Sequence, residues 1–330
     1  SRHPWVTLAI WAAAAVIAAV LIPTLLPGAL TTEIDFVNNP ESKQANTLLE
    51  ERLRGPRRVT EIVIVRSGEL TVDDTAFRDY VQKVYSDLAA MGPENIQGVT
   101  SYYLTQDPSL VSADRHTTIL PVVMAGTEDE ANKNIDRVLE VVRTDNGVNG
   151  FQVLTAGAAS IGKDFQDVAE RDLQKGEILG VPLALVILVL VFGAIAAAFL
   201  PLGLAVMAIL LALGATALMG QAFHFAFFVT NMITMMGLAV GIDYSLFIVS
   251  RYREERQKGL DKVEAIAAAG ATASRAVLFS GMTVVLALIG MFLVPLSVFR
   301  SLGMGAALVV TVSVLASLTL LPAVLSLLGD

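Results

Sequence analysis

Six apolar runs, each long enough to cross a bilayer, constrain this chain more than any other feature of its sequence. The hydrocarbon core of a membrane is about 30 Å thick, and a helix needs about 20 residues to span it. One run precedes a long polar stretch and the other five follow it closely, so the sequence predicts an α-helical membrane bundle of six transmembrane helices with one inserted domain. The runs are residues 5–26, 178–199, 202–219, 225–249, 276–294 and 302–328.

The first run is longer than the 7–15 residues of a secretory hydrophobic region, and no A-x-A cleavage site separates it from the next polar segment. We therefore expect residues 1–29 to hold a first transmembrane helix rather than a signal peptide. Because the chain opens on Ser1, we expect that the natural start has been removed. In the later runs, Pro201, Pro295 and Gly303 lie where we expect helices to break.

Composition agrees with a membrane protein and argues against an enzyme. Hydrophobic residues make up 54% of the chain and charged residues 16%, whereas soluble domains have about 45–50% and about 25%. The chain has no Cys, and His3, His116 and His224 lie far apart, so we expect no metal site and no cofactor. The sequence contains no Walker A, H-E-x-x-H or G-x-S-x-G motif, which argues against an enzyme and against nucleotide hydrolysis as an energy source.

Charge is distributed unevenly along the chain and predicts its orientation. Residues 30–175 carry 24 acidic and 15 basic side chains, a net charge of −9 that argues against a nucleic-acid partner. The joint at residues 250–275 carries six Lys and Arg side chains, so the positive-inside rule places it in the cytoplasm. We therefore expect a multi-pass protein of the cytoplasmic (inner) membrane, with residues 30–175 extracytoplasmic and residues 176–330 forming helices two to six.

The polar stretch alternates between strand-like and helix-like patterns. Two rounds of strand, helix and strand predict an α+β domain with the βαββαβ order of ferredoxin-like folds. Residues 42–54 predict an amphipathic helix before this domain, and residues 161–175 predict a helix that continues into the second span. The six central elements are expected at residues 60–66, 73–91, 99–104, 117–124, 128–143 and 151–155.

Asp243 is the ionisable residue that lies inside a predicted span, within the segment NMITMMGLAVGIDYSLFIVSRYREER. A carboxylate near the middle of a membrane helix costs roughly 2.5–3.5 kcal/mol on insertion scales, so its presence requires a function or a partner. One interpretation is a protonated Asp that holds the bundle together through a hydrogen bond. We favour a proton carrier, because a change in hydration or partner moves an intramembrane carboxyl group between its protonated and ionised forms.

Tyr244 lies about 100° further around the same helix, on the face that also carries Gly237, Gly241 and Ser245. Gly237 and Gly241 form a small-xxx-small pair, which permits the close approach of another helix. Because the chain contains one such signature helix, we expect this face to meet a second one on another copy or in a missing half. The Tyr244 hydroxyl would then reach the opposing Asp243 carboxyl group.

The fifth run carries two further polar residues, Ser280 and Thr283, within the segment SRAVLFSGMTVVLALIG. Residues three positions apart are neighbours on a helix surface. Their hydroxyls are expected either to bind the Asp243 carboxyl group or to bind their own backbone carbonyls. The predicted proton relay therefore consists of Asp243 and Tyr244, with Ser280 and Thr283 as additional candidates.

The segment GLAVGIDYSLFIVSRYREE resembles the fourth-helix signature of the MmpL branch of the resistance-nodulation-division (RND) superfamily, and SRAVLFSGMTV resembles its fifth helix. The order of one span, an outer domain and five spans is similar over the whole chain. The resemblance implies export of lipids or other hydrophobic molecules driven by the proton-motive force. It also implies that Asp243 and Tyr244 match the family's Asp-Tyr pair and that Ser280 matches a polar fifth-helix position.

Members of this family usually contain two such repeats, whereas this chain contains one. We therefore expect an RND-type half-transporter that either lacks its second half or pairs with other copies, as a dimer in preference to a trimer. Two other functions stay open at this point. One is a membrane-anchored lipid-binding or sensing module, and the other is a proton-using accessory subunit of protein translocation.

Overall fold

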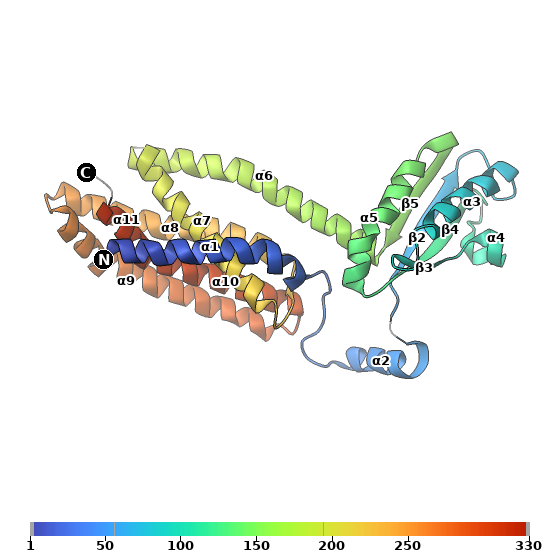
Figure 1. The fold of residues 1–330 in the computed structure, drawn as a ribbon, viewed down its shortest axis with the longest axis horizontal. Helices are drawn as coiled ribbons and strands as arrows, with labels where there is room; N and C mark the ends of the chain where they lie inside the picture. The colour runs from blue at the N-terminus through green and yellow to red at the C-terminus, as the bar shows by residue number, and fades with distance from the viewer. Residues whose placement is uncertain (1–2, 56, 194, 328–330) are drawn as a thin grey trace. The chain divides into compact units, whose positions relative to one another are not determined.

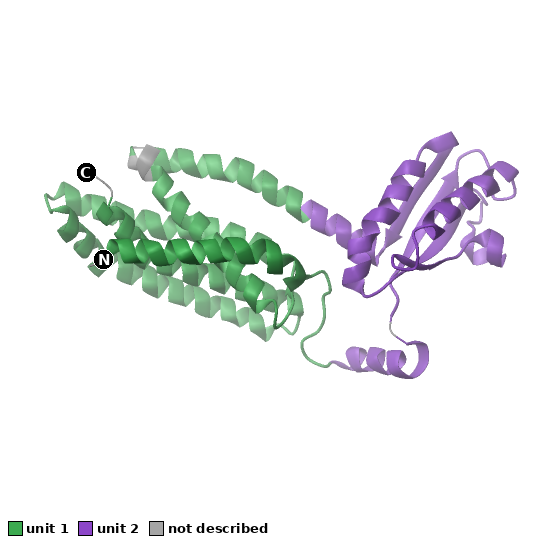
Figure 2. Ribbon diagram, in the orientation of Figure 1, with its two compact units in different colours: residues 1–39, 169–330 green, residues 40–168 purple. Residues whose placement is uncertain are grey.

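The computed structural model describes residues 3–55, 57–193 and 195–327. Its contacts divide the chain into two compact units (Figure 2). The first, here called the helical unit, consists of residues Ser1–Asn39 and Ala169–Asp330, and the second, the α/β unit, consists of Pro40–Val168. The α/β unit falls within the range 30–175 predicted for the inserted domain.

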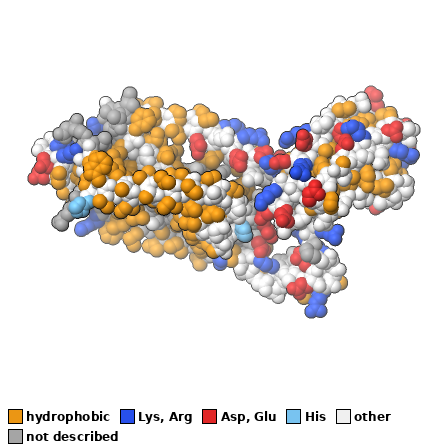
Figure 3. All heavy atoms as spheres, viewed as in Figure 1, with side chains coloured by type: hydrophobic (Ala, Val, Ile, Leu, Met, Phe, Trp, Pro, Cys, Tyr) orange, Lys and Arg blue, Asp and Glu red, His pale blue; other side chains and the backbone are white. Residues whose placement is uncertain are grey.

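Six helices in the described part of the chain are long and apolar enough to cross a membrane, in agreement with the six predicted spans (Figure 1). Among them α7, α8 and the C-terminal helix are the most buried, with 39%, 39% and 56% of their most apolar stretches inside the structure, against 6% for α1 and α6. Figure 3 shows hydrophobic side chains covering the visible face of the helical unit, as lipid contact requires. The helices are α1 (Pro4–Ala29), α6 (Ala158–Phe192), α7 (Ile195–Met219), α8 (Val229–Gln257), α9 (Lys262–Ile289) and α10 (Ser297–Leu315), which continues through a π-helical turn η5 (Ala316–Leu320) into α11 (Leu321–Leu327).

Two of the three predicted helix breaks are wrong. The second span ends at Phe192 rather than at residue 199, because Gly193 takes a positive φ of 67° that favours glycine and turns the chain. As a result α7 begins at Ile195, and Pro201 lies inside it instead of before it. Gly303 lies inside α10, whereas Pro295 does separate two helical segments, as predicted.

The helix α6 is continuous over 35 residues and crosses the boundary between the two units. It begins at Ala158, directly after the last strand of the α/β unit, and carries Pro182 in its apolar half. The prediction that a helix at residues 161–175 continues into the second span is therefore confirmed.

The α/β unit contains a four-stranded sheet in the order β3-β4-β2-β5, in which all neighbouring strands are antiparallel. The strand β4 therefore lies between β2 and β3, which are separated in sequence by the helix α3 (Thr75–Ala89). A second helix, α5 (Glu128–Asp145), begins at a capping box of Thr127 and Glu130 and leads into β5. The strands are β2 (Thr60–Ser67), β3 (Ile96–Val99), β4 (Thr117–Met124) and β5 (Phe151–Gly157).

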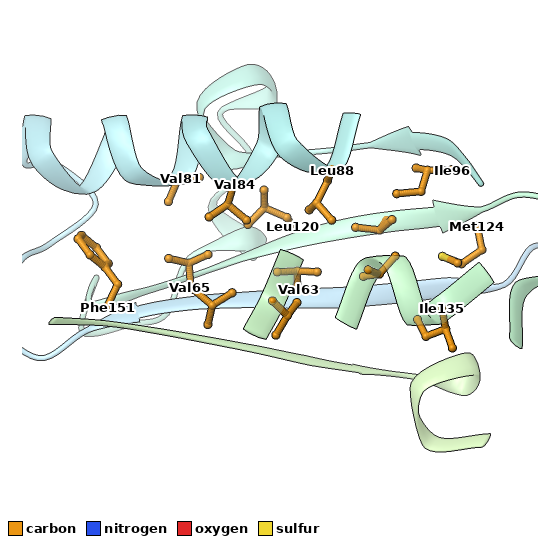
Figure 4. Packing of buried hydrophobic residues seen from close by; sticks show 14 of the residues in the cluster. Val63, Val65, Val81, Val84, Leu88, Ile96, Leu120, Met124, Ile135 and Phe151 are labelled. Carbon is orange, nitrogen blue, oxygen red and sulfur yellow. The ribbon is translucent and has the colours of Figure 1, made fainter. Parts of the chain in front are cut away.

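The core of this unit lies between the sheet and the two helices, where alternate strand residues meet one face of each helix (Figure 4). Val63 and Val65 from β2, Leu120 from β4 and Phe77 from α3 are fully buried. The other face of the sheet is more open, since Leu154 is 45% exposed. One hydrophobic core of this kind is sufficient to stabilise a domain of this length.

The predicted strand at residues 99–104 is partly wrong. The strand β3 lies earlier, at Ile96–Val99, and Tyr102–Thr105 forms a helical turn, α4. The Tyr103 hydroxyl donates to the carbonyl oxygen of Val72 at 2.7 Å, and its ring packs against the core. This segment therefore closes the end of the core instead of extending the sheet, although its β-branched and aromatic residues favour a strand.

Two shorter features complete the fold. Residues Glu41–Leu49 form α2, which continues into a π-helical turn, η1 (Glu50–Arg54), and neither buries a residue. In the helical unit, the two-residue strands β1 (Leu30–Thr31) and β6 (Phe225–Ala226) pair in parallel. As a consequence the fourth span starts four residues later than predicted, because Phe225 belongs to β6 and α8 begins at Val229.

Candidate functional site

The helix α8 carries Asp243 and Tyr244 and packs against α7, α9 and α10. Neighbouring residues on a helix point about 100° apart, and here this difference separates the two side chains. Tyr244 is 7% exposed and faces the interior, whereas Asp243 is exposed on the outer surface of the helix bundle. Of the Asp-Tyr pair, Tyr244 therefore lies inside the bundle and Asp243 lies on its surface.

The Tyr244 ring lies against the backbone of α9 at a glycine. A Cβ atom built at Gly281 would be 3.6 Å from both Cε2 and the hydroxyl oxygen of Tyr244, and 2.3 Å from a methyl group of Val314. Any larger residue at Gly281 would displace Val314, which contacts it from α10. The position of the tyrosine thus depends on a close approach of α8, α9 and α10.

Gly237 and Gly241 permit the close helix packing that we predicted for them. A Cβ atom at Gly241 would be 2.7 Å from the Cα atom of Ala205 on α7. One at Gly237 would be 2.4 Å from Cγ1 of Ile209 on α7 and 2.8 Å from Cγ2 of Val309 on α10. Small residues in membrane helices allow backbones to approach in this way.

The predicted partner of this face is wrong, however. We expected the face with Gly237, Gly241 and Tyr244 to meet a second signature helix, but it packs against α7, α9 and α10 of the same chain. The physical reason is that a glycine face permits the closest backbone approach, and neighbouring helices of the same chain occupy it. What α8 presents outward is instead a stripe at every fourth residue, here called the Asp243 stripe, which consists of Met235, Ala239, Asp243 and Phe247.

Ser280 and Thr283 are both exposed on α9. The Thr283 hydroxyl donates to the carbonyl oxygen of Phe279 at 2.9 Å, so in this structure it binds its own backbone, one of the two predicted alternatives. Within the described part of the chain, no hydrogen bond joins Asp243 to Tyr244, Ser280 or Thr283. A relay through these residues stays a prediction.

Two buried hydroxyls near the end of the last span were not predicted. Ser313 and Ser317 are each 1% exposed, and their Oγ atoms have no hydrogen-bond partner among the described residues. Ser317 lies in the π-helical turn η5, a distortion that often marks functional sites in helices. Their spacing of four residues was visible in the sequence, but serine is common in membrane helices and usually binds its own backbone.

The last turns of α8, within the basic joint, carry a network of ion pairs. Arg251 pairs with Glu254 and Glu255, each at 2.7 Å, and Lys258 pairs with Glu255 at 2.9 Å. Glu255 is only 6% exposed, and its buried carboxylate is neutralised by two cations that are themselves more exposed. This cluster terminates α8 with a fixed network of charges.

A second buried carboxylate, Glu61, holds the start of α6 in the α/β unit. It occupies an inward position on β2, in the same alternation as Val63 and Val65, and is fully buried. Its Oε1 atom accepts hydrogen bonds from the backbone N–H groups of Ala159 at 2.8 Å and Ser160 at 3.1 Å. A carboxylate at a helix N-terminus is stabilised by the orphan N–H groups and the helix dipole. Glu61 therefore ties the sheet to the helix that becomes the second span.

The fold is that of a multi-pass membrane protein, assembled from one span, an α/β domain and five further spans. Comparison with known proteins gives its family. The profile described as the MMPL family matches residues 37–330. The chain belongs to the MMPL family of RND-type transporters, and it is a multi-pass protein of the inner membrane.

Individual relatives agree with this assignment. A putative membrane protein of Streptomyces coelicolor is 32% identical over 304 residues, covering 92% of this chain and 42% of that protein. The trehalose monomycolate exporter MmpL3 of Mycobacterium tuberculosis is 30% identical over 310 residues, covering 92% of this chain and 32% of that protein. The chain thus spans less than half the length of these relatives.

A solved structure shares the fold. The cryo-EM structure of the hedgehog release protein Disp from the water bear Hypsibius dujardini aligns with a TM-score of 0.57 at 12% identity. The alignment covers 99% of this chain and 49% of that chain. At this identity the likeness concerns the fold alone.

Proposed function

We propose that the protein carrying this chain exports lipids or other hydrophobic molecules and is driven by protons that pass through Asp243. The observation that supports this most directly is the position of Asp243, an ionisable residue exposed on an otherwise apolar stripe of α8. Ionisable residues in membrane helices rarely face lipid and usually face a bundle interior or a water-filled cavity. A partner surface over the Asp243 stripe would place the carboxylate at such an interface.

That partner is, in this proposal, a second repeat or a second copy of the chain. The chain spans less than half the length of its relatives, which leaves room for a further repeat in them. Tyr244 anchors the relay from the inside of the bundle, because its buried ring is fixed against Gly281. Ser280 and Thr283 lie exposed on α9 and would line the same partner surface if the second half covers α9 as well.

Proton flow supplies enough free energy for a conformational cycle. Each elementary charge that crosses 100 mV of membrane potential contributes about 2.3 kcal/mol. One or two protons therefore bias an equilibrium between two conformations by a few kcal/mol, which is the size of a typical allosteric coupling. A change at α8 must then reach the domain that handles the substrate.

We infer that α6 carries this change. It is one helix from the α/β unit into the membrane, and Glu61 fixes its first turn to the sheet. We further infer that the α/β unit is ferredoxin-like and extracytoplasmic. The strand order β3-β4-β2-β5 supports the first inference, and the six Lys and Arg side chains at residues 250–275 support the second. The proposed direction, export, is that of the relative MmpL3, whereas another relative, MmpL11 of Mycobacterium tuberculosis, is named a heme uptake protein.

The test is Asp243→Asn in the native protein that contains this chain, reconstituted in vesicles with an imposed pH gradient. Asn fills the same space and forms hydrogen bonds but carries no titratable proton. We expect lipid export to stop while expression and helical content stay at the wild-type level. Met235→Leu, on the same stripe, is the matched control and should leave export unchanged. Export by Asp243→Asn at the wild-type rate would contradict the proposal.

A further inference from the structure

The α/β unit contains a pocket between its two helices that the transport proposal does not use. It has a volume of about 520 Å³ and is lined from both α3 and α5. Charged side chains dominate its polar part, with three carboxylates against one guanidinium. Apolar atoms of Ala90, Met91 and Val141 complete the wall. The charged residues that line it are Asp87, Arg137, Glu140 and Asp145.

Asp145 distinguishes this pocket from an ordinary groove between helices. The residue is 2% exposed, although it is the last residue of a helix and carries a charge. Its Oδ1 atom pairs with the Lys83 ammonium group, whereas its Oδ2 atom is buried and has no hydrogen-bond partner among the described residues. A buried charged oxygen without a donor costs free energy that a bound ligand would recover.

The ion pair with Lys83 shows that the Asp145 carboxylate accepts hydrogen bonds from an ammonium group. The Lys83 ammonium group bridges Asp145 and the Asp87 carboxylate, 3.1 Å from its Oδ2 atom. The hydrogen bonds that Lys83 donates to these two carboxylates, Asp145 first, raise the pKa of Lys83 above its usual value. Three carboxylates against the Lys83 and Arg137 cations leave the pocket with one net negative charge.

A cation that donates hydrogen bonds therefore fits this pocket better than a metal ion. Among the described residues, no group of three or more His, Asp or Glu side chains converges in a way that would hold a metal. An ammonium group, in contrast, brings N–H donors on a compact charge and needs only two or three acceptors.

We propose that the pocket between α3 and α5 binds a primary ammonium group, which donates to Asp145 Oδ2 and lies beside the Glu140 carboxylate. Arg137 lines the same pocket and suits an anionic group carried next to the ammonium, such as a phosphate. The ligand class is thus a primary amine, with or without a neighbouring phosphate. It is either a free metabolite or the headgroup of an aminolipid, and the inference does not depend on proton-driven export.

The first experiment measures binding of radiolabelled ethanolamine to the full chain in lipid nanodiscs by equilibrium dialysis. We expect saturable binding that ethanolamine phosphate displaces more strongly than ethanolamine itself. Choline should not compete, because its quaternary nitrogen has no N–H donor for Asp145 Oδ2. Competition by choline as strong as that by unlabelled ethanolamine, or an absence of saturable binding, would overturn the proposal.

Variants then assign the site. Asp145→Asn keeps the shape of the side chain but removes its charge, so we expect the affinity for ethanolamine to fall about tenfold or more. Asp79→Asn makes the same charge change at an exposed position of α3 outside the pocket and should bind like the wild type. Equal affinities for the wild type and Asp145→Asn would contradict the proposal. Since the choline comparison uses only the wild type, it holds even if Asp145→Asn fails to fold.

The source of the amine is decided by changing the bilayer. If the ligand is a lipid headgroup, nanodiscs that contain phosphatidylethanolamine should lower ethanolamine binding relative to nanodiscs of phosphatidylcholine alone. If the ligand is a free amine, both bilayers should give the same binding. Both results are consistent with an ammonium site; lowered binding identifies a lipid headgroup as the source, and equal binding identifies a free amine.

Discussion

Two carboxylates show how differently the two units are built. Glu61 is fully buried in the α/β unit and accepts two backbone N–H groups of α6. Asp243 in the helical unit is exposed on an apolar stripe, and the described residues offer it no hydrogen bond that would satisfy it. The Glu61 carboxylate receives its hydrogen bonds within its own unit and has a structural role. In our proposal the Asp243 carboxylate is completed by a partner surface and exchanges protons.

Burial shows the same contrast. In the α/β unit one continuous core joins the sheet to α3 and α5. In the helical unit α7, α8 and α10 form a packed centre, whereas α1 and α6 bury 6% of their most apolar stretches. Lipid replaces protein contacts for apolar side chains at no cost, so exposure of this kind does not destabilise a membrane helix. Exposed apolar side chains on the outer helices are therefore compatible with contact to lipid or to a partner half. An exposed polar residue on these helices is more informative, because lipid cannot satisfy it.

The largest expected effect concerns what covers the Asp243 stripe. The chain has no natural cysteine, so single-cysteine variants report one position each. Phe247→Cys is exposed on the stripe, and we expect it to cross-link to a second copy or to a second repeat that carries its own cysteine. Ile248→Cys, the next residue, is 2% exposed and should form no such cross-link. Equal cross-linking at both positions would remove the contrast between the two faces of α8.

The next effect tests Glu61 as a structural carboxylate. Glu61→Ala leaves two buried N–H groups of α6 without an acceptor, so we expect the local free energy of opening to fall by roughly 3 kcal/mol. Hydrogen exchange at Ala159 and Ser160 in the full chain measures this loss directly. Glu69→Ala, at an exposed position shortly after β2, is the control and should change exchange little. Unchanged protection in Glu61→Ala would mean that other contacts hold α6.

A smaller effect is expected from the packed centre of the helical unit. In Gly241→Ala the new Cβ atom would be 2.7 Å from the Cα atom of Ala205, so α7 or α8 must shift. Overpacking of this kind typically costs about 1–3 kcal/mol. Gly270→Ala on α9 has no atom within 4 Å of its new Cβ atom and should raise stability slightly, because alanine favours helix. Thermal melting of the solubilised chain should therefore shift in opposite directions for the two variants.

The smallest effect is the pH dependence of a surface ion pair in the α/β unit. The Arg115 guanidinium donates to Asp73 at 2.6 Å and holds the pKa of that carboxyl group below its usual 3.8. A depressed folded-state pKa means that this contribution to stability is present above the unfolded-state value and is lost as the pH falls through the folded-state value. Asp73→Asn should thus lower the urea midpoint slightly at neutral pH and match the wild type in strong acid. A difference that persists in strong acid would assign the effect to another cause.

Much of the architecture was predictable because it follows from local patterns. The six apolar runs and the strand and helix periodicities depend on residues close in sequence, and β4 and α5 begin where their patterns do. The errors arose where a distant contact or the exact position of a turn overrides a local preference. Tyr103 forms a helical turn because its hydroxyl reaches Val72, and Pro201 lies inside α7 because the preceding turn occurs at Gly193.

The sequence alone identified Asp243 and Tyr244 as candidate site residues, because an ionisable side chain inside an apolar run carries a high free-energy cost wherever it is packed. It also indicated that Gly237 and Gly241 permit close approach, since the absence of a side chain does not depend on the neighbour. Only the tertiary structure decided which helix approaches these glycines and which side of α8 remains exposed. It also decided that the carboxylates of Glu61 and Asp145 are both buried and that one oxygen of Asp145 has no hydrogen-bond donor among the described residues. These outcomes depend on pairs of residues far apart along the chain, whose distances exist only once the chain has folded.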